Sequence, residues 1–103
     1  MTNKFLLKFL WLEKLIAVSL DQKVGDRSAP ITEFFFWPKT DAWEEMRLDL
    51  EKRSWISESE SIVLLNQVTE VINFWQEKSE SNRKKEFQAA KEKFSNCSFV
   101  GRD

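Results

Sequence analysis

The side chains that most often carry catalysis or bind metal ions are scarce in this sequence. The 103 residues contain no histidine and a single cysteine, Cys97, so a zinc site and an intrachain disulfide are both excluded. Acidic pairs occur at Glu44 and Glu45 and at Glu58 and Glu60, but each pair starts a predicted helix, where carboxylates stabilise the helix dipole. The two glycines form no phosphate-binding loop. The sequence therefore predicts a protein that is not an enzyme, with no catalytic residue, metal, cofactor or small-molecule substrate.

Basic and aromatic side chains are the ones whose chemistry suits binding. The stretch EFFFWPKTDAW, residues 33–43, holds five aromatic rings in eleven residues. Most of these rings are expected in the core, and we expect Trp37 or Phe35 to face a partner by stacking on a base or docking on an apolar surface. Basic side chains can contact phosphates, and the alternative for each is a solvated surface position. The candidate contact residues are Lys23, Arg27, Trp37, Lys39, Arg47, Lys52, Arg53, Arg83, Lys84 and Lys85.

This pattern leaves two functional classes open: a module assembled into a ribonucleoprotein, and a protein-binding adaptor with no direct RNA contact. Residues 1–40 carry a net charge of +2, residues 41–80 of -6 and residues 81–103 of +3, for a total of -1. The near-neutral total gives no overall attraction to nucleic acid. In a ribonucleoprotein we therefore expect a peripheral position with extensive protein contact.

The elements that position these residues fit within one domain of the α+β class. A chain of 103 residues, 42% apolar and 32% charged, has room for one core. Alternating apolar residues over 5–20 predict an antiparallel β-hairpin that turns at residues 12–14, with a single helix as the alternative. Charged residues interrupt this run, so no membrane span is predicted. Residues 21–40, which include both prolines, have the composition of a loop.

Two helices are predicted to follow and to pack against the hairpin. Each begins with a capping residue followed three positions later by Glu, and we place them over residues 41–53 and 57–78. The apolar stripe of the second helix is Ile62, Leu65, Val68, Ile72 and Trp75. We expect the domain to span residues 1–78, and residues 79–103 to form a basic C-terminal extension, either a tail or a short helix that docks on a partner.

Three runs of the sequence are similar to a known family. They are KFLWLEKLIAVSLDQ at 8–22, APITEFFFWPKTDAWEEM at 29–46 and WISESESIVLLNQVTEVINFWQ at 55–76. Together they resemble the plastid-specific ribosomal protein 3 family, a small-subunit protein of chloroplasts with cyanobacterial relatives. The resemblance implies a structural component of the chloroplast 30S subunit that contacts 16S rRNA and small-subunit ribosomal proteins. It also implies a location on ribosomes of the plastid stroma, or in the cytoplasm of a cyanobacterium.

One position departs from the pattern expected of this family. Lys39 stands where an Arg is expected after the FFWP motif, which keeps the charge and loses the bidentate geometry of a guanidinium. Pro38 is expected to end an extended backbone segment and Asp41 to begin the next helix. The contact region is then predicted at the tip of this junction, with Trp37 and Lys39 together and Arg27 nearby. We expect no homo-oligomer.

Overall fold

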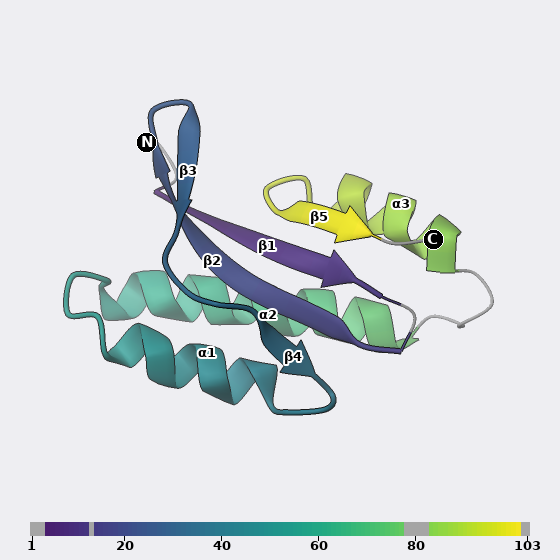
Figure 1. The fold of residues 1–103 in the computed structure, drawn as a ribbon, viewed down its shortest axis with the longest axis horizontal. Helices are drawn as coiled ribbons and strands as arrows, with labels where there is room; N and C mark the ends of the chain where they lie inside the picture. Colours follow the sequence, from purple (N-terminus) through teal and green to yellow (C-terminus); the bar gives the residue numbers. More distant parts are fainter. Residues whose placement is uncertain (1–3, 13, 78–82, 102–103) are drawn as a thin grey trace.

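A computed structural model describes residues 4–12, 14–77 and 83–101, with the side chains of residues 83–86 outside that description. It confirms the α+β class (Figure 1). In chain order the elements are β1 (Phe5–Trp11), β2 (Ile16–Val24), β3 (Arg27–Pro30), β4 (Phe35–Trp37), α1 (Ala42–Glu51), α2 (Glu58–Glu77), α3 (Arg83–Lys93) and β5 (Ser98–Gly101).

Strands β1 and β2 form the predicted antiparallel hairpin. Their register runs from Phe5 opposite Gln22 to Trp11 opposite Ile16. The connecting turn has none of the residues that tight hairpins prefer, and a long-range contact supports it. The Trp75 indole Nε1 donates a hydrogen bond of 3.1 Å to the carbonyl of Leu12, from a position 63 residues along the chain. The hairpin is therefore held by packing against α2 as well as by its own ladder.

The segment 21–40, which we expected to be a loop, contains the end of β2 and two further strands. Both β3 and β4 pair antiparallel with β2 along the same edge, β3 with residues 21–24 and β4 with residues 16–18. Thr32 fills the gap between them, because its Oγ1 accepts a 3.0 Å hydrogen bond from the Leu20 N–H. The loop prediction was wrong because a proline is tolerated on an edge strand, as Pro30 is at the end of β3, whereas Pro38 follows β4 as expected.

Helices α1 and α2 confirm the two predicted helices and their caps. The Asp41 carboxylate accepts a 3.1 Å hydrogen bond from the Glu44 N–H. Ser57 and Glu60 form a reciprocal capping box, with bonds of 3.1 and 2.9 Å. Figure 1 shows α2 running behind β1 and β2, with α1 beside it. The predicted stripe of α2 is correct except at Ile62, which is 53% exposed.

The C-terminal segment is not the basic tail that we expected, because it forms a helix and a strand of the sheet. Helix α3 is the short helix that was the alternative, and β5 then pairs parallel with β1, with Phe99 opposite Phe9. The sheet order is therefore β3-β2-β1-β5, with β4 also on β2. The rings of Phe9 and Phe99 stack with centroids 5.4 Å apart. Gly101 lies so close to Phe87 that an added Cβ would come within 2.9 Å of its ring.

Candidate contact surfaces

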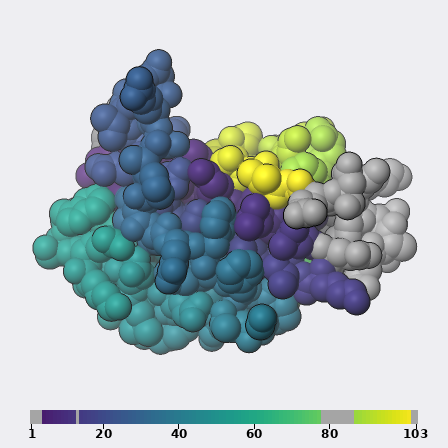
Figure 2. All heavy atoms as spheres, viewed as in Figure 1, coloured from purple at the N-terminus to yellow at the C-terminus, as the bar shows by residue number. Residues whose placement is uncertain are grey.

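The tip of the β2–β3 hairpin, residues 23–28, forms an arm that projects from the body of the molecule (Figures 1 and 2). All six residues are exposed. Gly25 has a φ of 63°, which suits the first central position of a two-residue turn of the type that matches strand twist. Lys23 lies opposite Ser28 and Arg27 opposite Val24, so the two cations lie on opposite faces of the arm.

The aromatic stretch is divided between the core and the surface by the alternation of β4. Phe35 lies opposite Val18 and Trp37 opposite Ile16, and both rings pack against the hydrophobic core. Phe36 lies on the other face and is 38% exposed. We expected Trp37 or Phe35 to face a partner, whereas the more exposed ring of β4 is Phe36. The Trp37 Nε1 is buried with no hydrogen-bond partner among the described residues.

Lys39 and Arg27 do not lie near each other, contrary to the expectation. Lys39 follows β4, which pairs with the start of β2, whereas Arg27 pairs with Val24 at the end of β2. The intervening length of β2, at about 3.3 Å per residue, separates the two cations by roughly 20 Å or more. Trp37 and Lys39 therefore belong to a surface distinct from the arm.

Two of the candidate cations, Arg47 on α1 and Arg53 just after it, are engaged within the molecule. Arg47 forms ion pairs with Glu44, at 2.6 Å, and with Glu51. The hydrogen bond with Arg47 lowers the pKa of the Glu44 carboxyl, and the same contact raises the pKa of the Arg47 guanidinium. Arg53 pairs with Asp49 at 3.0 Å and also donates to the Ile31 carbonyl at 3.0 Å. These arginines stabilise the helix and its attachment to the preceding segment.

The remaining candidate cations fall into two groups. Lys52 is exposed just after α1 and has no ion pair with another described residue. Arg83, Lys84 and Lys85 begin α3, and their side chains lie outside the described residues. Among the candidates whose side chains are described, the arm thus holds the only pair of exposed cations within one short element.

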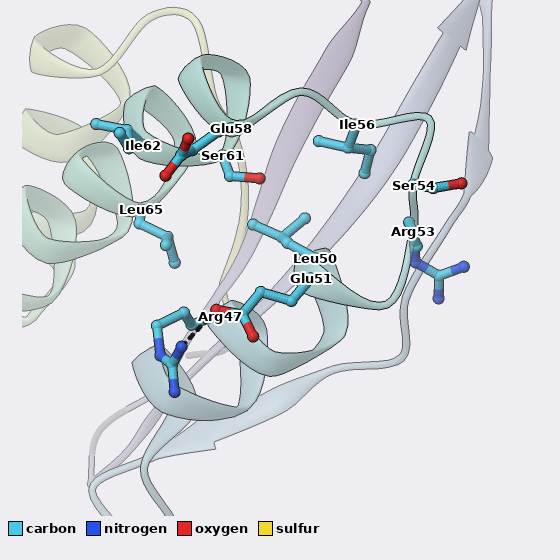
Figure 3. A pocket seen from close by; sticks show the side chains of 10 residues that line it. All are labelled: Arg47, Leu50, Glu51, Arg53, Ser54, Ile56, Glu58, Ser61, Ile62 and Leu65. Carbon is cyan, nitrogen blue, oxygen red and sulfur yellow. Dashed lines mark hydrogen bonds and ion pairs between the residues drawn. The ribbon is translucent and has the colours of Figure 1, made fainter.

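A concave surface between α1 and α2 was missed by the sequence analysis. Its larger hollow has a volume of about 390 Å³ and lies at the α1–α2 connection. Figure 3 shows Leu50, Ile56, Leu65 and Ile62 around it, with Arg47 and Glu51 at one side. A smaller hollow of about 170 Å³ lies further along α2, between Trp37, Trp43 and the helix. Ile62 belongs to this surface, and no local pattern in the sequence marks it as more exposed than the rest of the apolar stripe of α2.

Comparison with known proteins identifies the family of the chain. Residues 31–78 match the family described as plastid and cyanobacterial ribosomal protein (PSRP-3/Ycf65). The small ribosomal subunit protein cS23 of Euglena stellata is 61% identical over 101 residues, which cover 98% of this chain and 99% of that protein. The chain belongs to the plastid and cyanobacterial ribosomal protein family. The cS23 protein of Euglena viridis is 64% identical over the same share of each chain. A probable cS23 of Synechococcus sp. (strain JA-3-3Ab) is 53% identical over 71% of this chain and 74% of that protein.

Membership of the plastid and cyanobacterial ribosomal protein family confirms the resemblance drawn from the sequence runs, and with it the plastid or cyanobacterial ribosome as the place of action. A ribosomal protein of this family is a structural component and not an enzyme. Within the described ranges, no group of three His, Cys, Asp or Glu side chains gathers closely enough to hold a metal ion. No helix of those ranges has the length and apolar character needed to cross a bilayer.

Proposed function

We propose that this protein is a structural component of the chloroplast small ribosomal subunit, and that it contacts 16S rRNA through the arm, residues 23–28. The names of the cS23 relatives support the assignment to the small subunit. The observation that carries the RNA contact is the pair of exposed cations, Lys23 and Arg27, on an arm that projects beyond the body of the molecule (Figure 2). The role is architectural and involves no chemical step.

The geometry of the arm suits contact with an RNA backbone. Four cross-strand pairs between β2 and β3 and a two-residue turn fix its conformation before binding, so little conformational entropy is lost when it docks. With one cation on each face, the arm can contact phosphates on both of its sides. Contacts of this kind position a protein on RNA without reading the base sequence, which fits a component that fixes local rRNA geometry.

Binding of the purified protein to 16S rRNA across a potassium chloride series tests this proposal. The variant with Lys23→Gln and Arg27→Gln loses two phosphate contacts, so the slope of log K against log salt should become shallower by about 1.4 to 1.8. The matched control changes Lys14 and Lys91 to Gln, which removes the same charge from two exposed positions that are not candidate contact residues. Equal effects of the two double variants would mean that the arm makes no particular contact and that only total charge matters.

Trp37 and Lys39 form a second, smaller candidate contact at the other end of β2. We propose that Lys39, which is exposed, reaches a phosphate or an acidic partner there, while Trp37 holds β4 against α2. Trp37→Ala should then lower the melting temperature, whereas Lys39→Gln should leave it unchanged and reduce incorporation into small subunits. A Trp37→Ala variant of unchanged melting temperature but reduced incorporation would instead make Trp37 the contact residue.

A protein-binding adaptor without direct RNA contact is the second candidate function. The observation in its favour is that carboxylates of α1 pair with Arg47 and Arg53, within a region, residues 41–80, whose net charge is -6. This reading predicts that the purified protein has no salt-dependent affinity for 16S rRNA, although it still cosediments with small subunits. The same binding series therefore separates the two functions.

A further inference from the structure

The two hollows between α1 and α2 lie along one line. The residues of α2 that border them recur every three or four positions, on one stripe of the helix. These are Glu58, Ser61, Ile62 and Leu65 at the larger hollow and Thr69, Ile72, Asn73 and Gln76 at the smaller. At a rise of 1.5 Å per residue, the stripe is about 27 Å long. We call this surface the α1–α2 groove.

The floor of the α1–α2 groove is apolar at the larger hollow and more polar at the smaller. Ile62 is 53% exposed at the edge of the larger hollow, where it can cover an aliphatic side chain placed against Leu50 and Leu65 (Figure 3). The amide side chains of Asn73 and Gln76 border the smaller hollow. Such amides can both donate to and accept from an extended backbone, whose own polar groups have no internal partners.

The charges around the α1–α2 groove select a basic partner. The charged side chains that line the larger hollow are Arg47, Arg53, Glu51 and Glu58, which sum to zero. The two arginines also pair with Glu44 and Asp49, which lie outside the lining, so these six side chains together sum to -2. Glu58, at the larger hollow, is exposed and has no ion pair with another described residue. An RNA backbone or a second copy of this acidic surface would be repelled, whereas Lys and Arg side chains would be attracted.

We propose that the α1–α2 groove binds an extended, basic segment of a neighbouring ribosomal protein, with an aliphatic side chain in the larger hollow. At about 3.3 Å per residue, roughly eight extended residues span the groove. This inference rests on the proposed place in the small subunit and names the chemistry of the protein partner there. In this proposal the arm contacts RNA and the groove contacts protein.

Site-directed photocrosslinking in assembled subunits tests the proposal. A benzophenone maleimide is attached to Ile62→Cys in a Cys97→Ser background. The matched control is Val63→Cys in the same background, because Val63 is adjacent, aliphatic and 67% exposed, but does not border the groove. Each labelled full-length protein is added to small subunits from a strain that lacks it, cosedimented and irradiated, and the adducts are identified by mass spectrometry. We expect the Ile62 label to react with a ribosomal-protein peptide rich in Lys or Arg, and the Val63 label to lose that adduct.

Each other outcome overturns the proposal in a different way. An Ile62 adduct on 16S rRNA, on a peptide without net positive charge or on a second copy of this chain assigns the groove to another partner. Cosedimentation without any Ile62 adduct means that the groove is empty in the subunit, and the proposed function stands. If neither labelled protein nor the wild type cosediments, the proposed function itself fails.

A second variant pair measures affinity rather than proximity. Ile62→Glu places a charge against the apolar floor of the groove, one helical turn from Glu58, so we expect binding to the depleted subunits to weaken by about tenfold or more. Val63→Glu adds the same charge one residue away and should change binding much less. If both variants weakened binding equally, the added negative charge alone would explain the loss of affinity, and the groove would not be the binding site.

Discussion

Replacing Phe99 with alanine tests whether the C-terminal strand belongs to the core. Its ring centroid lies 5.4 Å from that of Phe9, 5.9 Å from that of Trp11 and 6.4 Å from that of Phe94. Truncation of a fully buried Phe costs about 3 to 5 kcal/mol, part of which comes from aromatic pairs of about 0.5 to 1.5 kcal/mol each. Because Phe99 is only partly buried, we expect the free energy of unfolding to fall by about 2 to 3 kcal/mol.

Thermal denaturation followed by circular dichroism measures this loss. For a domain of this size, each kcal/mol shifts the melting temperature by about 4 to 8 °C, so Phe99→Ala should lower it by about 8 to 24 °C. Val100→Ala is the control, because Val100 is the next residue of β5, lies on the opposite face and is 47% exposed. A Phe99→Ala melting temperature that matches that of the control would refute the reasoning, and would make the C-terminal segment an appendage.

Three further outcomes follow from single contacts. Gly101→Ala should destabilise the protein in urea denaturation, because its Cβ would lie 2.9 Å from the Phe87 ring; unchanged stability would mean that the ring moves freely. A backbone N–H bond and the Lys4 ion pair lower the pKa of Glu60, so its contribution to stability is complete above its ordinary pKa of 4.5 and is lost as the pH falls through the lower folded value. Lys4→Gln should raise the Glu60 pKa in an NMR titration. Burial raises the pKa of Cys97 to about 12, so its thiol should react with Ellman's reagent at pH 8 far more slowly in the folded than in the unfolded protein.

The parts of the fold that could be predicted are those whose signals are local. The alternation over β1 and β2 and the capping residues at Asp41 and Ser57 each act within a few residues, and the structure confirms the elements they predict. Strand β5 has only four residues, and its partner Phe9 lies 90 positions before Phe99. No local pattern specifies a pairing of that separation, because the energy that selects it comes from burying rings against one another.

The sequence predicted which residue types could contact a partner, but it did not predict which of those side chains are free to do so. Lys23 and Arg27 were selected as cations, and only the structure shows that they share a projecting arm. Arg47 was selected in the same way, but Glu44 and Glu51 occupy it. Glu44 lies three residues before Arg47 and Glu51 four residues after it, a spacing that predicts ion pairs on a helix. The α1–α2 groove depends on how two helices pack, so its depth had no counterpart in the sequence.

The arm holds Lys23, Asp26 and Arg27 and so has a net charge of +1, and pairing of the carboxylates at its base preserves that charge in a protein of net charge -1. The buried Asp21 carboxylate is held by Lys8 Nζ at 3.1 Å, and Glu60 is held by Lys4 Nζ at 3.0 Å. Lys4 lies beside the arm, since its carbonyl accepts a 2.8 Å hydrogen bond from the Lys23 N–H. Because these two carboxylates are paired with lysines, they do little to reduce the positive charge of the arm.

Distance separates the arm from the carboxylates at the start of helix α1. The start of α1 follows β4, at the opposite end of β2 from the arm, and β2 is nine residues long. At about 3.3 Å per residue this is roughly 30 Å, which exceeds the Debye length of about 8 Å at physiological ionic strength several-fold. The acidic side chains at the start of α1 therefore do not cancel the field of Lys23 and Arg27. One small chain can bind RNA at one end and a basic protein along its helices.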